Sequence, residues 1–211
     1  MTSKITVYNG ALRNLGERRL ASLTENVPAR HELDAVWADD FVDDVLEKGL
    51  WNFATRTTQQ DFREDVEPGF GFRRAFLKPE DFIRTAMLAS DEYFSSPLMG
   101  YADEQGYWFA DIDEIYVSYV SNDDTYGADY ALWPPSFTRF AEAYLAHRIA
   151  PAIAPKMMDA AFRLQRKLLT EARSRDAMNE PTKMLPEGDW SAARRGSRGR
   201  SDRGSRHQLL G

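Results

Sequence analysis

Apolar residues recur at three- and four-residue steps through two long stretches in the C-terminal half of the chain. In the first, one helical face carries Phe137, Phe140, Ala141, Tyr144, Leu145 and Ile149. Pro134 and Pro135 suit the entry to a helix, whereas Pro151 and Pro155 interrupt its hydrogen bonding. The second face carries Met157, Ala161, Leu164, Leu168 and Ala172. The pattern predicts two helices joined by a Pro-rich corner.

Two further helical patterns lie near the N-terminus. Residues 4–20 place Ile5, Tyr8, Leu12 and Leu15 on one face. A longer pattern over residues 29–53 has the apolar stripe Leu33, Val36, Trp37, Phe41 and Val45. Its other face is rich in carboxylates, namely Asp34, Asp39, Asp40, Asp43, Asp44 and Glu47. We interpret these acids as a solvated helix face, with a metal site or an acid/base pair as the alternative.

The middle of the chain contains extended patterns. Residues 54–63 are rich in Thr, and the turn at Pro68-Gly69 precedes a second extended segment with Phe70, Phe72 and Phe76. Residues 78–81 are predicted to open a short helix that carries Phe82, Ile83 and Met87. Residues 105–110 and 114–120 are rich in aromatic and β-branched residues and predict a β-hairpin, connected by the polar residues 111–113. Residues 121–131 have the composition of a loop.

These elements predict a mainly α protein: a helical bundle with a small inserted antiparallel β element and an extended C-terminal tail. The body covers residues 4–181, with the β insertion at about 54–76 and 105–120. The tail covers residues 182–211. A length of 211 residues, of which 43% are hydrophobic, allows one domain with such an appendage.

Composition excludes several kinds of chemistry. The chain has no Cys, so it has no disulfide, thiolate metal site or Cys nucleophile. Its three histidines, His31, His147 and His207, lie far apart and lack metal-ligand spacing. We therefore expect no metal, no cofactor and no enzymatic activity. No apolar leader and no apolar run of membrane-spanning length are present, so we expect a soluble intracellular product with no membrane partner.

Charge is unevenly distributed along the chain. From Trp190 onward there are six Arg and one acid, a net charge of +5. Of the 27 basic and 33 acidic side chains, 21 and 32 remain in residues 1–189, a net charge of −11. The tail has too few apolar residues to form a core, so we expect it to need a partner.

Several segments form a recognisable series when they are taken in order along the chain. They include Tyr8-Asn9-Gly10-Ala11-Leu12, residues 15–17, 46–54 with Trp51-Asn52-Phe53, 76–81, 116–120, and 132–144 with Leu132-Trp133-Pro134. This series resembles the tail tubular protein A-like head-to-tail adaptors of tailed bacteriophages and gene transfer agents. The resemblance covers most of residues 4–181. It rests on structural signatures that carry no chemistry.

The resemblance implies a virion structural protein at the head–tail junction, assembled in the host cytoplasm. Twelve copies would form a ring that joins the portal protein to a tail nozzle or stopper protein. Double-stranded DNA would pass through the ring without specific binding, because a lumen of Asp and Glu repels phosphates. We expect the β element to make tail or intersubunit contacts through Trp108, Tyr116 and Tyr119. We expect the tail to dock on the portal through Trp190, Arg194, Arg195, Arg198, Arg200, Arg203 and Arg206.

Two other functions compete with this interpretation. Residues 194–206 have the Arg/Gly/Ser composition of segments that contact phosphates, which would make the chain a nucleic-acid-binding protein. The carboxylates of residues 39–47 would serve an enzyme only if they form a perturbed pair in a pocket.

Overall fold

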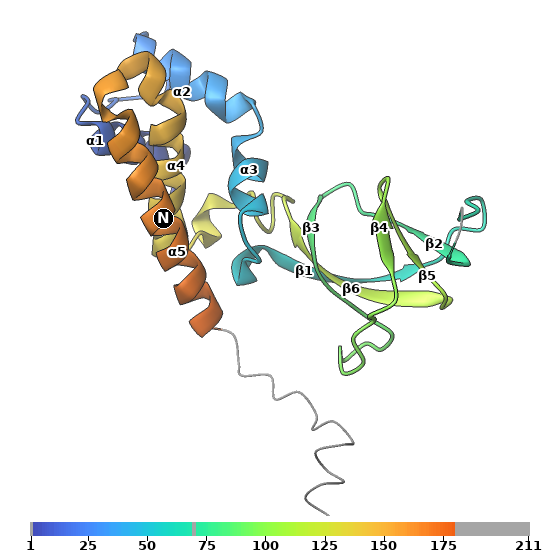
Figure 1. Cartoon of the computed structure of the whole chain (residues 1–211). Helices are drawn as coiled ribbons and strands as arrows, with labels where there is room; N and C mark the ends of the chain where they lie inside the picture. The colour runs from blue at the N-terminus through green and yellow to red at the C-terminus, as the bar shows by residue number, and fades with distance from the viewer. Residues whose placement is uncertain (1, 69–70, 180–211) are drawn as a thin grey trace, which may run out of the picture. The chain divides into compact units, whose positions relative to one another are not determined.

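The computed structural model describes residues 2–68 and 71–179. Within these residues the chain has five α-helices and two three-stranded antiparallel sheets, 45% helix and 20% strand (Figure 1). The prediction of a mainly α bundle with a small β element is therefore wrong, and the fold is mixed α/β. The β part is larger than expected because it spans the stretch from Thr55 to Ser121 and encloses a hydrophobic core of its own.

The N-terminal helices are shorter than their patterns suggest. Helix α1 spans Lys4–Leu15 and ends at Gly16, whose φ of 75° is the left-handed conformation that caps helices. The predicted single helix over residues 29–53 is wrong, because α2 (Pro28–Ala38) and α3 (Phe41–Glu47) are separate. Asp40 between them has φ 58°, a left-handed conformation that Asp tolerates better than most residues do. The break lets α3 bury Phe41, Val45 and Leu46.

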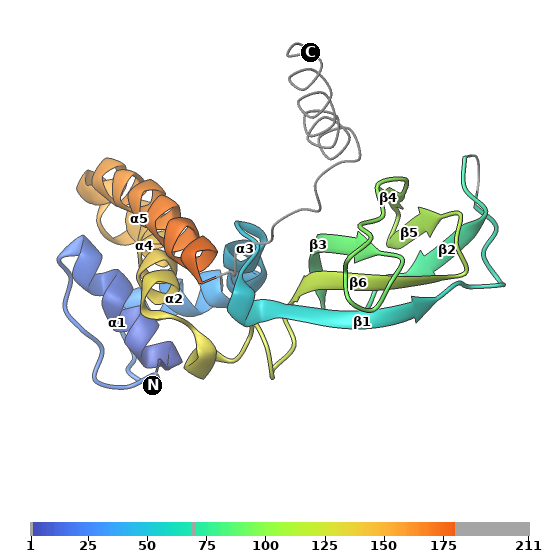
Figure 2. The same ribbon diagram turned by 90° about the horizontal axis from the view of Figure 1, so that it is seen from below.

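The two C-terminal helices follow their prediction. Helix α4 (Pro135–Ile153) and α5 (Met158–Met178) lie side by side in both views (Figures 1 and 2). Pro151 lies inside the last turn of α4, and the 3₁₀ turn η3 (Pro155–Met157) makes the corner. All six apolar residues predicted for the inner face of α4 are buried. On α5, Ala161 and Ala172 are buried.

The strands assemble differently from the prediction. One sheet has the order β1 (Thr55–Asp61), β6 (Glu114–Ser121), β3 (Phe82–Ala89). The other has the order β2 (Arg74–Leu77), β5 (Tyr107–Ala110), β4 (Ala102–Glu104). The short helix predicted after residue 78 is wrong, because Phe82, Ile83 and Met87 lie on β3. Pairing with β6, a partner distant in sequence, decides the conformation there.

The predicted hairpin between residues 105–110 and 114–120 is also wrong. Both segments contain strands, but β5 and β6 belong to different sheets, so residues 111–113 connect one sheet to the other. The two-residue turn is Gln105-Gly106, which joins β4 to β5 with φ of 48° and 82°. Two consecutive positive φ angles are typical of the type I′ hairpin turn.

Two hydrophobic cores form in one compact unit, Met1–Asn179. The first is made mainly by the helices and includes Tyr8, Leu33, Phe41, Trp51 and Phe140. The second is made by the two sheets and contains Phe76, Leu88, Trp108, Ala110, Ile115, Val117 and Tyr119. We call residues 55–121 the β module and the remaining described residues the helical module.

Candidate functional site

Four of the six carboxylates predicted on the polar face of residues 29–53 are bound by other elements, whereas Asp40 and Glu47 are exposed. Asp44 accepts hydrogen bonds from the Tyr144 hydroxyl (3.0 Å) and Arg148 Nη1 (2.8 Å), and Arg148 Nη2 also reaches Asp39 at 3.2 Å. Asp43 accepts from Asn122 Nδ2 at 2.8 Å. These side chains thus tie α3 to α4 and to the loop after β6. The interpretation of these acids as a solvated helix face is therefore corrected for Asp39, Asp43 and Asp44, because their contacts give them a structural role.

Asp34 on α2 forms a second such contact. It accepts from the Tyr8 hydroxyl at 2.8 Å and from Arg30 Nη1 at 2.5 Å, while Lys4 lies 3.6 Å away. Burial raises the pKa of Asp34, but the Tyr8 hydrogen bond and the charges of Lys4 and Arg30 outweigh burial, so the pKa is lowered. Burial and the Asp34 carboxylate raise the pKa of Tyr8. The cluster stays ionised at Asp34 and neutral at Tyr8, which suits a structural anchor.

The β module has its own polar centre at Asp81, just before β3. Asp81 accepts hydrogen bonds from Arg56 Nη1 (2.9 Å), the Tyr119 hydroxyl (3.1 Å) and Ser121 Oγ (2.5 Å). Burial raises the pKa of Asp81, but the hydrogen bonds from Ser121, Arg56 and Tyr119 together lower it below its ordinary value. Burial and the Asp81 charge raise the pKa of Tyr119. One carboxylate thus joins the ends of all three strands of this sheet.

Sequence reasoning missed this centre. Its members come from positions 56, 81, 119 and 121, and no spacing along the chain brings them together. Among residues 2–68 and 71–179, no group of three His, Asp or Glu side chains is arranged to hold a metal ion. The observed clusters pair acids with Arg, Tyr, Ser and Asn, which is the arrangement of structural ion pairs.

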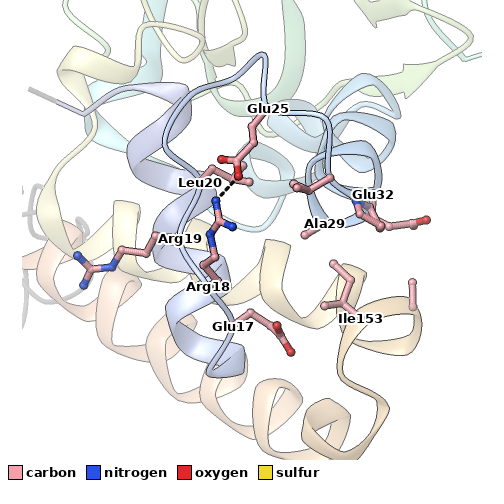
Figure 3. A pocket seen from close by; sticks show the side chains of 11 residues that line it. Glu17, Arg18, Arg19, Leu20, Glu25, Ala29, Glu32 and Ile153 are labelled. Carbon is pink, nitrogen blue, oxygen red and sulfur yellow. Dashed lines mark hydrogen bonds and ion pairs between the residues drawn. The ribbon is translucent and has the colours of Figure 1, made fainter.

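A cavity of about 400 Å³ opens in the helical module (Figure 3). The loop between α1 and α2, the start of α2 and the end of α4 line it, and Arg18 forms an ion pair with Glu25 across the loop. Its apolar wall includes Leu20, Val27 and Ile153. The other residues that line it are Glu, Arg, Pro and Ala, so none of its side chains is a Ser, Thr, Cys or Lys nucleophile.

Two of the three predicted contact residues of the β module are buried. Trp108 is fully buried and donates from Nε1 to Thr85 Oγ1 at 2.9 Å, and Tyr119 is 1% exposed. This burial corrects the expectation for both residues, because their apolar area is used by the core of their own chain. Tyr116 lies on the opposite face of β6, half-buried, with its hydroxyl donating to Glu114 at 2.9 Å. For Tyr116, a contact with the tail or with a neighbouring subunit stays a prediction.

The predicted docking residues of the tail all lie outside the described residues. They are Trp190, Arg194, Arg195, Arg198, Arg200, Arg203 and Arg206. In the described part of the chain, no helix combines the length and the apolar character that a membrane span requires.

No known family model and no curated protein matches this chain. Three residues of the series described above hold loops or turns in place. Asn9 exchanges two hydrogen bonds with Leu20, donating to its oxygen (3.1 Å) and accepting from its nitrogen (2.7 Å). Trp51 Nε1 donates to Leu46 O at 3.0 Å, and Trp133 Nε1 donates to Gly127 O at 2.8 Å. Asn9, Trp51 and Trp133 therefore have a structural role in this chain.

Proposed function

We propose that this protein is a structural head-to-tail adaptor of a tailed phage or a phage-like particle. Twelve copies form a ring that joins the portal protein to a tail nozzle or stopper protein. The ring belongs to the head–tail junction of the virion and assembles in the host cytoplasm. The protein acts by binding its neighbours and catalyses no reaction.

The observation that carries this proposal is the presence of two separate cores in one compact unit. An adaptor has to present one surface to the portal and another to the tail. Two modules, each with its own core, can do so without either surface disturbing the packing behind the other. Polar contacts fix the joint between them: Arg84 Nη1 donates to Glu47 O at 3.2 Å, and the Asn122 N–H donates to Asp81 O at 3.0 Å.

The distribution of charge also supports the proposal. The β module contains 13 acidic and 6 basic side chains, a net charge of −7, whereas residues 133–179 contain 4 acidic and 8 basic ones, a net charge of +4. An acidic surface repels the phosphates of a duplex, so DNA can slide past without sticking. We therefore include double-stranded DNA as cargo of the channel and not as a specific ligand.

The enzyme hypothesis is weaker. The carboxylates of residues 39–47 on which it rests include Asp39 and Asp44, both of which are bound to Arg148. A carboxylate already paired with an Arg is a poor general base. The nucleic-acid alternative rests on residues 194–206, which lie outside the described residues, and on no contact within them.

The experiment is to measure mass and symmetry with and without a portal ring. Light scattering of the isolated protein should give a monomer or a weak oligomer. Addition of portal rings should produce a twelve-fold ring on the portal, visible by electron microscopy. Absence of portal binding, combined with DNA affinity that falls steeply with salt, would overturn the proposal in favour of nucleic-acid binding.

A further inference from the structure

The two edges of the sheet β1-β6-β3 differ. On one edge, β3 pairs with β6 through two register shifts, and an isolated bridge joins Ala89 to Pro97. Bulges and Pro at a strand edge are devices that prevent further pairing. On the other edge, β1 pairs with β6 in seven consecutive partners with no irregularity. Its central residues, Thr57, Thr58, Gln59 and Gln60, carry no charge and include no Pro. The edge of β1 lacks these protective devices.

The register shows which backbone groups of β1 face outward. Phe62 N–H donates to Asp113 O across the β1–β6 pair (3.4 Å), so every second residue before it, Gln60 and Thr58, also faces β6. Thr57, Gln59 and Asp61 must then point their N–H and C=O groups to the free edge. Arg63 fits this alternation, since its N–H faces outward and donates to Ala75 O of β2 at 2.8 Å.

Between Thr57 and Asp61, no other element in the described part of the chain forms hydrogen bonds with these outward N–H and C=O groups. The Gln59 carbonyl accepts a hydrogen bond from the neighbouring Thr58 hydroxyl at 3.2 Å. A cavity of about 450 Å³ lies beside this edge, lined by residues 59–61 of β1, the following residues 62–63 and residues 77–80. Leu77, 41% exposed, supplies an apolar position in its wall. An extended segment lying there would pair with β1 and cover Leu77.

The charges that line this cavity, which forms a groove along the edge of β1, favour a basic occupant. Its two cations are already in ion pairs: Arg63 with Asp65 at 3.1 Å, and Lys78 with Asp103. Asp61 and Glu80 also line the groove, and neither has an ion-pair partner among the described residues. The unpaired charges are therefore both negative, in a module of net charge −7. A second copy would bring its own Asp61 and the same negative charge to this edge, which opposes self-pairing.

We propose that the outer edge of β1 binds an extended, basic segment of another protein by strand addition, and that this protein is the tail-side partner of the adaptor. The identity of the partner rests on the proposed function. Hydrogen bonds to the outward backbone groups of Thr57, Gln59 and Asp61 provide the affinity. An aliphatic side chain of the bound segment packs on Leu77 and sets the register. Lys or Arg side chains of the segment pair with Asp61 and Glu80, so a basic segment is preferred.

The test uses the full chain, labelled for amide NMR, and a synthetic peptide of alternating Lys and Val. The peptide should shift the amide signals of Thr57, Gln59, Asp61 and residues 78–80. A peptide N-methylated at alternate amides keeps the charge and side chains but cannot add as a strand, so it should bind about tenfold more weakly or not at all. A peptide of alternating Glu and Val should not bind.

Two variants at position 59 separate the contribution of the backbone N–H to peptide binding from that of the side chain. Gln59→Pro removes an outward donor without removing a backbone bond to β6, so the chain should stay folded and lose peptide binding. The side-chain bond from Gln59 Nε2 to Glu114 is lost in Gln59→Pro and in Gln59→Ala alike, so it does not distinguish the two variants. Gln59→Ala keeps the N–H and should bind as the unmodified chain does. Before any peptide is added, the backbone amide of Gln60 should exchange with deuterium more slowly than the backbone amide of Gln59, because only the backbone N–H of Gln60 faces β6.

Equal binding of the N-methylated peptide, signal shifts centred away from β1, or retained binding by Gln59→Pro would overturn strand addition. Concentration-dependent dimerisation that Gln59→Pro abolishes would overturn it as well, in favour of a second copy. Peptide binding by a chain that never attaches to a portal would support strand addition while overturning the adaptor function and the tail-side identity of the partner. The two proposals can therefore fail separately.

Discussion

Gly10 of α1 lies directly against the carboxyl group of Glu142 of α4: a Cβ added at Gly10 would come within 2.0 Å of Glu142 Cδ. Glu142 is only 6% exposed and pairs with Arg13, also on α1, at 3.0 Å. Burial raises the pKa of Glu142 above its ordinary value, although the charges of Arg13 and Arg139 oppose the shift. The close approach of α1 and α4 explains a Gly inside a helix, where it costs about 1 kcal/mol relative to Ala.

Gly10→Ala should therefore destabilise the protein despite its better helix propensity. The added methyl forces Glu142 to move and disturbs its pair with Arg13, so the free energy of unfolding should fall by about 1–3 kcal/mol in urea titrations. Gly100→Ala is the control, because no atom lies within 4 Å of its added Cβ. In a Glu142→Ala background the cost of Gly10→Ala should shrink. An equal cost in both backgrounds would contradict the contact.

The raised pKa of Glu142 predicts a defined pH dependence. The folded pKa lies above the ordinary value of 4.5, so the folded state holds the proton more tightly than the unfolded state does. The stability that Glu142 contributes is fully present below pH 4.5 and is lost as the pH rises through the folded pKa. Unfolding free energies of the protein and of Glu142→Gln, measured across this range, should diverge as the pH rises. A pH-independent difference would show that the shift is absent.

The contribution of Asp81 to stability should depend on pH in the opposite direction. Its folded pKa lies below the ordinary value of 3.8, so its contribution is present above that value and is lost as the pH falls through the folded pKa. Asp81→Asn should lower the free energy of unfolding by about 1–3 kcal/mol at neutral pH, because it removes the negative charge and one of the two acceptor oxygens that Arg56, Tyr119 and Ser121 contact. Glu80→Gln, at the neighbouring exposed position, is the control and should leave stability nearly unchanged. Equal effects of the two changes would refute the role of Asp81.

The two C-terminal helices were predictable because their signal is local. The apolar positions of α4 repeat over several turns, and Pro at both ends marks its limits, so no distant partner was needed to identify it. Segment 82–89 was misassigned for the opposite reason. Phe82, Ile83 and Met87 fit a helical spacing as well as a strand, and only pairing with β6, more than thirty residues away, decides between them.

The polar centre at Asp81 shows a further limit of sequence reasoning. Each of its residues is ordinary in its own segment, and the centre exists only because β1, β3 and β6 end at one place. The turn at Gln105-Gly106 was different, because Gly at the second position was a visible signal. It was missed because the strand before it, β4, has three residues, too few for a periodic pattern.

Removal of residues 182–211 should leave the fold intact. Both cores are built from residues that precede position 179, and Met1–Asn179 form a compact unit. The end of α5 is held within that unit: Asn52 Nδ2 donates to Asp176 O at 2.9 Å, and Arg173 Nε donates to Lys48 O at 2.7 Å. We therefore expect the truncated chain to give an unchanged circular dichroism spectrum and an unchanged free energy of unfolding.

The same truncation should abolish attachment to the portal if the tail docks there. The tail carries Trp190, its largest apolar side chain, and a charge of +5 from that residue onward, so it suits an acidic partner surface with one apolar pocket. A pull-down on portal rings should retain the full chain and lose the truncated one. Trp190→Ala should weaken retention at every salt concentration, whereas Arg194→Ala with Arg195→Ala should weaken it most at low salt, where ion pairs are least screened.

Normal retention of the truncated chain would exclude the docking role. If that chain also lost an affinity for DNA that the full chain has, the segment would be assigned to nucleic acid.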